Sequence, residues 1–365
     1  MIGLRSNIKY SVIVPTRNRA DILERCLLCL SELNPPLQGW EVLVVDNGST
    51  DSTKDVVERF VGKITNLQYY FESRPGLMMG RHLGCETARG DILCYIDDDS
   101  FVDKQWLAGI EKAFSDPKVV LVGGPNIPEY EVKPPLWMDG FWRKIEYGVL
   151  NGWLSLVNFG NQEIKISPRF VYGCNFNIRK NIFIELGGSH PDCIPKSLQR
   201  FQGDGETGLS DKLISLGYSA LYSPEVKVNH FIQASRLTLE YFCERAYYQG
   251  VSDSFTQIRR EHRIDCMRDA VIPNERANLL WINKIKKGYQ LLSERIYHSL
   301  ILMKLKIMNH QKDYLKIRTV ADKSYEEGKA FHRKEVESDP ALLEYVLREN
   351  FMGKNGEMPC PSQII

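Results

Sequence analysis

Three consecutive carboxylates, Asp97, Asp98 and Asp99, are the most distinctive chemical group in the sequence. They follow the apolar run DILCYI, which predicts a buried strand, so they stand at its carboxyl end. At roughly 5 Å and an effective dielectric near 20, each close pair of carboxylates repels by about 3 kcal/mol. A divalent cation removes that repulsion, and oxygen ligands suit Mg²⁺ or Mn²⁺. A solvated acidic turn is the alternative, but the place at a strand end favours a metal site.

A second acidic pair, Asp204 and Glu206, lies in the glycine-rich stretch QGDGETGLS, just before a predicted helix. One carboxylate in that place is often only a helix cap. Two of them among three glycines indicate a backbone that comes close to a ligand. We therefore expect Asp204 and Glu206 to belong to a ligand site, with a helix cap as the alternative.

Other polar residues follow predicted strands. Thr16, Arg17 and Arg19 come after the run YSVIVP, and Asp46 ends the run EVLVVD, where it can accept from a nucleobase N–H or from ribose hydroxyls. His230 follows SPEVKVN and is a candidate metal or phosphate ligand, although a lone histidine is more often structural. The loop TRNR has no glycine, which argues against a dehydrogenase or a nucleotidyltransferase.

The elements that position these residues alternate along the first half of the chain. Apolar runs predict strands, and apolar residues at steps of three and four predict helices between them. This alternation predicts an α/β fold with a mostly parallel sheet flanked by helices. Ligands bind at the carboxyl ends of the strands in such sheets. The predicted strands are Tyr10–Pro15, Glu41–Asp46, Leu67–Glu72, Asp91–Asp97 and Val119–Gly123.

Composition sets broad limits on the class of protein. The length of 365 residues predicts about two domains, and a composition of 43% hydrophobic and 25% charged residues predicts that they are folded. The formal net charge of +1 argues against a nucleic-acid binder. No run of 18 apolar residues occurs and the first nine residues do not resemble a signal peptide, so a cytoplasmic protein is expected. The nine cysteines, including the lone CxxC of Cys26 and Cys29, are expected to be reduced thiols.

The second half has a different pattern. Residues 125–169 hold three tryptophans among prolines and glycines and predict an irregular, substrate-facing region. From about residue 236 the pattern is helical to Phe351, and Asp339–Pro340 predicts a new helix start. We expect a catalytic domain over 1–240, a helical extension over 241–351, and a flexible tail over 352–365.

The helical extension carries an apolar stripe within a basic segment. Residues 284–318 hold nine Lys or Arg against two acids. The plain expectation is a helix that packs its stripe on the catalytic domain. The alternative is a peripheral contact with an anionic membrane surface. The stripe consists of Ile285, Tyr289, Leu292, Ile296, Leu300, Met303 and Ile307.

Five segments in order resemble glycosyltransferase family 2, which has the GT-A fold, over about residues 9–250. They are SVIVPTRNRADIL, EVLVVDNGSTDST, RPGLMMGRHLGCETARGDILCYIDDDS, YGCNFNIRKNIFIELGG and SPEVKVNHFIQASRLTLEYFCERAYYQG. The resemblance implies an inverting transfer of a sugar from a nucleoside-diphosphate donor, UDP by default, to a glycan, lipid-linked or polysaccharide hydroxyl. A non-catalytic nucleotide-sugar or glycan-binding protein on this fold, and a nucleotidyltransferase, remain the alternatives.

The resemblance also implies roles for individual residues. Asp97 and Asp99 match the DXD positions that hold ribose and the metal–diphosphate group, and His230 matches the histidine near the metal, expected to be Mn²⁺ or Mg²⁺. Glu206 stands where the family has its catalytic aspartate, which favours it over Asp204 as the base. His82 replaces the family's usual asparagine. The residues expected to hold the nucleotide sugar are Thr16, Arg17, Arg19, Asp46, Arg81, Asp97, Asp98 and Asn175.

Overall fold

The computed structural model describes residues 8–262, 264, 294–304, 306 and 310–353. Its centre is an eight-stranded sheet in the order β11-β13-β6-β12-β4-β1-β2-β3. Strand β1 pairs in parallel with β2 and β4, and β12 runs antiparallel between β4 and β6. The strands are β1 (Ile8–Thr16), β2 (Gly39–Asp46), β3 (Leu67–Phe71), β4 (Ile92–Tyr95), β6 (Leu121–Gly123), β11 (Ile164–Ile166), β12 (Phe176–Arg179) and β13 (Ala220–Tyr222).

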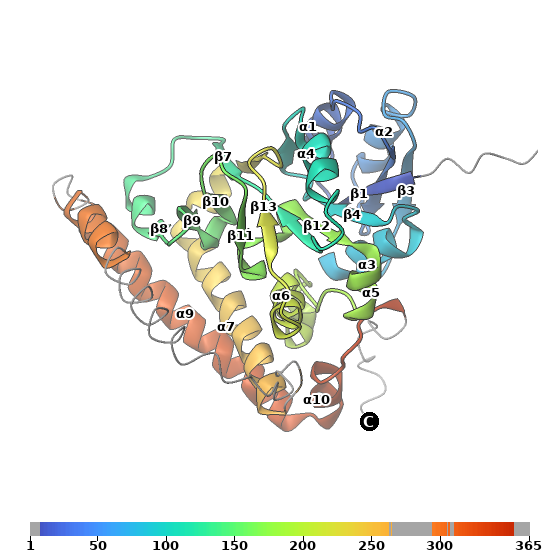
Figure 1. The fold of residues 1–365 in the computed structure, drawn as a ribbon. Helices are drawn as coiled ribbons and strands as arrows, with labels where there is room; N and C mark the ends of the chain where they lie inside the picture. Colours follow the sequence, from blue (N-terminus) through green and yellow to red (C-terminus); the bar gives the residue numbers. More distant parts are fainter. Residues whose placement is uncertain (1–7, 263, 265–293, 305, 307–309, 354–365) are drawn as a thin grey trace, which may run out of the picture.

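Helices cover both faces of this sheet, which confirms the predicted α/β fold (Figure 1). Val12 and Val14 of β1 face one core, whereas Ile13 between them faces the other, as the alternation of side chains along a strand requires. Helices α1 (Ala20–Ser31), α2 (Thr53–Glu58) and α4 (Trp106–Ala113) pack on the first face. Helices α3 (Leu77–Thr87), α5 (Lys180–Glu185) and α6 (Glu206–Ser215) pack on the second.

A second, six-stranded sheet lies beside the first, in the order β5-β14-β7-β10-β9-β8. Most of it comes from residues 125–169, where we expected irregular chain. The tryptophans of that region belong to a core: Trp153 stacks on Phe242 with ring centroids 5.5 Å apart. The strands are β5 (Ser100–Val102), β7 (Asn126–Tyr130), β8 (Arg143–Lys144), β9 (Val149–Asn151), β10 (Leu156–Asn158) and β14 (Val228–Ile232).

The C-terminal part is helical, as predicted. Helices α7 (Leu239–Glu261) and α9 (Gln311–Ser338) lie side by side (Figure 1). Two glycines allow this close approach, because a Cβ at Gly250 would lie 2.0 Å from the Tyr325 carbonyl oxygen and one at Gly328 would lie 2.1 Å from the Tyr247 carbonyl oxygen. Helix α10 (Pro340–Val346) begins with its cap at Asp339, as its sequence predicts.

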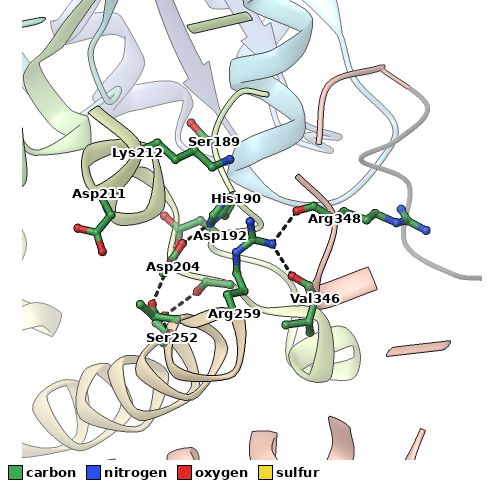
Figure 2. A network of polar contacts seen from close by, with 12 residues as sticks. Ser189, His190, Asp192, Asp204, Asp211, Lys212, Ser252, Arg259, Val346 and Arg348 are labelled. Atoms are coloured by element: carbon green, nitrogen blue, oxygen red, sulfur yellow. Dashed lines mark hydrogen bonds and ion pairs between the residues drawn. The ribbon is translucent and has the colours of Figure 1, made fainter. Parts of the chain in front are cut away.

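Beyond α10 the chain returns to the part that carries the sheets. The Phe351 N–H donates to the Gly187 carbonyl at 2.9 Å. Buried Arg259 of α7 donates through Nη1 to the carbonyls of Val346 at 2.5 Å and Arg348 at 2.6 Å (Figure 2). Lys212 Nζ of α6 donates to the Glu349 carbonyl at 3.0 Å. Residues 346–351 are thereby fixed against α6 and α7.

The described residues of the apolar stripe do not pack on the part of the chain that carries the sheets. Ile296, Leu300 and Met303 are 53%, 60% and 59% exposed, whereas Ile301 and Leu302 contact the aromatic core around Phe242. The packing expected for these three residues is therefore wrong. The other stripe residues, Ile285, Tyr289, Leu292 and Ile307, lie outside the described residues, as does the predicted tail from residue 354 on. Among the described helices, none is long and apolar enough to cross a membrane.

Candidate active site

Two adjoining cavities lie at the carboxyl ends of β1 and β4. The first, of about 510 Å³, is lined by Thr16, Arg17, Arg19 and the three aspartates 97–99, and we call it the aspartate cavity. The second, of about 460 Å³, is lined by Arg81 and Glu206, and we call it the glutamate cavity. Asp97 lines both. The parallel strand order thus brings together residues from distant parts of the chain, as the sequence predicts.

Arginines neutralise the aspartates of this site. Asp98 accepts from Thr16 Oγ1 at 2.7 Å and pairs with Arg19 Nη1 at 2.6 Å. Asp99 Oδ2 accepts from Arg19 Nη2 at 2.9 Å and from Arg236 Nη1 at 3.1 Å. The repulsion that we expected a metal ion to relieve is therefore already offset by two guanidinium groups. Sequence spacing did not single out Arg236.

Burial and charge pull the pKa values of these aspartates in opposite directions. Burial raises the pKa of Asp98 to about 7, and the Arg19 guanidinium offsets only part of that rise. Burial would also raise the pKa of Asp99, but His230, Arg19 and Arg236 hold it below its ordinary value. Asp99 is therefore the residue of this pair that is held ionised.

One oxygen of Asp99 remains without a hydrogen-bond donor. Asp99 Oδ1 is buried, and His230 Nε2 lies 3.3 Å from it. The Asp97 carboxylate is 31% exposed and lies 3.3 Å from Arg81 Nη2. The two carboxylates are ligands that suit Mn²⁺ or Mg²⁺, and the His230 imidazole lies beside them. Among the described residues no three such side chains already converge around one point, so a metal ion would require them to move.

Glu206 opens α6 at the wall of the glutamate cavity. Gly205 before it has φ +58°, a conformation that favours glycine. Glu206 Oε1 accepts from the Gly173 N–H at 3.0 Å, and Oε2 lies 3.4 Å from Arg81 Nη1. The side chain is 24% exposed. The Glu206 carboxylate is thus fixed by two contacts and remains accessible to solvent or a ligand, as a general base requires.

Asp204 is held differently. Its side chain is 4% exposed, and its two oxygens contact His190 Nδ1 and Thr256 Oγ1, each at 2.6 Å. Figure 2 shows Asp204 next to His190. Burial would raise the pKa of Asp204, but His190 and these hydrogen bonds hold it below its ordinary value. Both oxygens are in use, so the geometry favours Glu206 over Asp204 as the base.

Two other predicted residues are occupied by partners in the fold. Asn175 is 1% exposed and lines neither cavity. Its Oδ1 accepts from Trp106 Nε1 at 3.0 Å, and its Nδ2 donates to the Val226 carbonyl at 2.8 Å. The structure therefore gives Asn175 a structural place. Asp46 is 2% exposed and accepts from the Ser49 N–H at 2.7 Å and from Tyr69 Oη at 2.8 Å.

Asp192 lines the glutamate cavity and was not expected from the sequence. Its Oδ1 accepts from Gln202 Nε2 at 3.0 Å and from the Cys193 N–H at 2.8 Å. Burial and the nearby Glu206 raise the pKa of Asp192. The residue sits in the stretch SHPDC, whose pattern gives no signal of a site.

Comparison with known proteins finds glycosyltransferases among the similar sequences. The profile of glycosyl transferase family 2 matches residues 11–187. Glycosyltransferase AglE of Haloferax volcanii is 37% identical over 115 residues, 31% of this chain and 38% of its own. Glucosyl-dolichyl phosphate glucuronosyltransferase of the same organism is 23% identical over 249 residues, 67% of this chain and 76% of its own. The chain thus spans under two-fifths of the first relative and about three-quarters of the second.

The fold also has a solved counterpart. Mannosyltransferase PcManGT from Pyrobaculum calidifontis, in complex with GDP-Man and Mn²⁺, superposes with a TM-score of 0.51 at 19% identity, covering 89% of this chain and 87% of that one. This likeness shows that the fold is that of a GT-A domain. Residues 11–187 match glycosyltransferase family 2, and both relatives are named as glycosyltransferases.

Proposed function

We propose that this protein transfers a sugar from a nucleoside-diphosphate donor to a hydroxyl of a glycan or lipid-linked acceptor and inverts the anomeric carbon. The observation that carries the proposal is the pair of adjoining cavities, one lined by arginines and carboxylates and the other by Glu206. The structural counterpart in complex with GDP-Man and Mn²⁺ supports a nucleotide-sugar donor. In this proposal the nucleoside diphosphate of the donor lies in the first cavity, and the acceptor hydroxyl lies in the second.

The donor would lie in the aspartate cavity. Arg17, Arg19 and Arg236 line it and supply the positive charge that a diphosphate requires. Arg19 and Arg236 now pair with Asp99. Thr16, at the end of β1, would lie beside the nucleoside.

The same cavity would hold a metal ion if its carboxylates and His230 moved closer together. Asp99, through its donorless Oδ1, would hold Mn²⁺ or Mg²⁺ with Asp97 and His230. When bound, the cation would neutralise charge on the diphosphate leaving group. Asp98 would stay on Thr16 and Arg19, where it fixes the loop that follows β1.

Glu206 would act as the general base. The Gly173 N–H and Arg81 fix its carboxylate at the cavity wall. Gly173 is needed there, because a Cβ would lie 2.2 Å from Arg81 Nη2. A base that removes the hydroxyl proton as the oxygen attacks the anomeric carbon gives one displacement, which inverts that carbon.

The exposed apolar face offers a peripheral membrane contact. Ile296, Leu300 and Met303 project from a segment, 284–318, in which Lys and Arg outnumber acids nine to two. Such a face binds anionic lipid surfaces. We expect binding to anionic vesicles at low salt in a flotation assay, and a lower bound fraction after Leu300→Ser with Met303→Ser. No flotation of the wild-type protein would remove this part of the proposal.

A paired substitution tests the base. Donors are first found by thermal shift with UDP-Glc, UDP-GlcNAc and GDP-Man in the presence of Mn²⁺, and turnover of the stabilising donor is then followed by nucleotide release. Glu206→Gln should keep donor affinity and lower kcat about a hundredfold or more. Asp204→Asn should mainly lower thermal stability, because it breaks a buried pair with His190.

Two outcomes would contradict this assignment. If Asp204→Asn lost turnover while staying stable and Glu206→Gln kept it, Asp204 would be the base. If the wild-type protein bound a donor and released no nucleotide with any acceptor tried, the non-catalytic binding protein would be the better description.

A further inference from the structure

A third cavity, of about 610 Å³, lies where α7 and α9 meet the short helix η5 (Lys196–Phe201), and we call it the helical groove. Glu244 and Tyr248 of α7 line both this groove and the glutamate cavity. Tyr248 Oη donates to Glu244 Oε1 at 2.9 Å, so these two hydrogen-bonded side chains separate the two spaces. The groove thus adjoins the cavity that holds Glu206 and shares this wall with it.

A residue in the wall of the groove carries a buried amide without partners. Gln199 lines the groove, is 7% exposed, and makes no hydrogen bond through either its amide nitrogen or its amide oxygen. Leaving a buried polar atom unpaired costs about 1–3 kcal/mol. Such a group calls for an explanation, and a ligand that supplies both a donor and an acceptor, as an adjacent pair of hydroxyl groups does, would provide one once the side chain turns toward it.

Aromatic rings and carboxylates complete the lining. The ring of Tyr247 lies 6.1 Å, centroid to centroid, from both Tyr248 and Phe331. Aromatic walls with a few well-placed polar groups are typical of small-molecule sites, and the apolar faces of sugar rings pack on such walls. Glu240 and Glu244 add acceptors for hydroxyl groups.

The charge and the kind of side chain argue against a lipid in this groove. Among its described lining residues none is Leu, Ile or Val. Glu240 and Glu244 outnumber Lys196, and Lys196 Nζ already pairs with Glu244 at 2.9 Å. A lipid phosphate would meet a net negative lining without an aliphatic channel beyond it. A neutral saccharide matches both properties.

We propose that the helical groove binds the second and following sugar units of a neutral glycan acceptor, whose terminal hydroxyl lies at Glu206. The inference rests on the proposed function, since the terminal sugar is placed at the base. It adds a substrate class: an acceptor of at least two sugar units, recognised away from the reacting hydroxyl.

The test measures how affinity depends on acceptor length. Neutral gluco-, manno- and N-acetylgluco-oligosaccharides of one to six units are titrated against the full chain by ligand-observed NMR, without donor. We expect at least one series in which a di- or trisaccharide binds tenfold or more tightly than its monosaccharide. Phe331→Ala and Gln199→Leu should each reduce that ratio to twofold or less, while Glu327→Ala, exposed on α9, should leave it unchanged.

The Gln199→Leu variant separates binding from folding. Removing an unpaired buried amide should leave thermal stability equal or higher, so a loss of length dependence in that variant reflects the ligand. A ratio unchanged by both variants, or no series with length dependence, would overturn the proposal. So would geranyl phosphate, if it displaced the oligosaccharide from the wild-type groove and no longer bound to Phe331→Ala.

These titrations are independent of turnover. If Glu206→Gln kept full nucleotide release while the oligosaccharide series still showed length dependence, the assignment of the base would fail and the groove would stand. If transfer were normal and length had no effect, the groove alone would fail.

Discussion

Replacing Arg259 with methionine should destabilise the protein strongly, because this arginine fixes residues 346–351 to α7. Its side chain is among the largest that are fully buried, and Nη1 donates to the carbonyls of Val346 and Arg348 at 2.5 and 2.6 Å. Hydrogen bonds from a charged donor contribute about 1.5–3 kcal/mol each. Methionine has a similar volume but cannot donate these two hydrogen bonds. The free energy of unfolding should therefore fall by about 3–5 kcal/mol.

The matched control is the next residue on the same helix. Arg260 is 53% exposed and pairs with Asp211 at 2.8 Å, so Arg260→Met should change stability by at most about 1 kcal/mol. Urea unfolding followed by tryptophan fluorescence gives both values. Hydrogen exchange should also quicken at the Phe351 amide, which donates to Gly187. Equal losses in the two variants, or less than 1 kcal/mol for Arg259→Met, would refute the reasoning.

Three further outcomes follow from the structure. Gly250→Ala should lower stability by about 1–3 kcal/mol in thermal unfolding, because the new Cβ would lie 2.0 Å from a carbonyl oxygen of α9; an unchanged Tm would contradict the close packing. Burial lowers the pKa of His82 to about 3, and its neutral Nε2 accepts from the Ser189 N–H at 3.1 Å. The contribution of His82 to the free energy of unfolding is therefore complete above about pH 6.5. It falls by about 1.4 kcal/mol for each pH unit as the pH drops from there toward 3. His82→Asn should therefore make urea unfolding less sensitive to pH between 7.5 and 4.5, and an identical slope would count against it. Asp99→Asn should abolish turnover in a folded protein, and full wild-type activity in excess EDTA would exclude the metal.

Strand order made the grouping of residues around the aspartate cavity predictable from sequence. Thr16 and Asp97 lie close together because β1 and β4 are parallel neighbours, and the alternation of strands and helices predicts that arrangement. The start of α6 was equally visible, since Leu209 and Leu213 mark its buried face after the glycines. These features depend on local periodicity and on a general rule for parallel sheets.

The rest depended on partners far away in the sequence. In the sequence, Asp204 and Glu206 are equally well placed to be the base. The structure favours Glu206 because Thr256, 52 residues beyond Asp204, donates a hydrogen bond to one of the Asp204 oxygens. The aspartate triplet suggested unrelieved repulsion because Arg236, 137 residues beyond Asp99, could not be placed beside it. Side-chain pairing across such separations leaves no periodic trace in the sequence.

The return of the C-terminal segment has a consequence for biosynthesis. His190, which holds Asp204, packs against Phe351 with ring centroids 5.2 Å apart. A ribosome therefore releases both sheets and α6 well before the residues that cover His190 have been made. We expect the nascent chain to wait in a partly folded form with this apolar surface open, a state that chaperones bind. The contact between His190 and Phe351 would form only when the chain through Phe351 has left the exit tunnel.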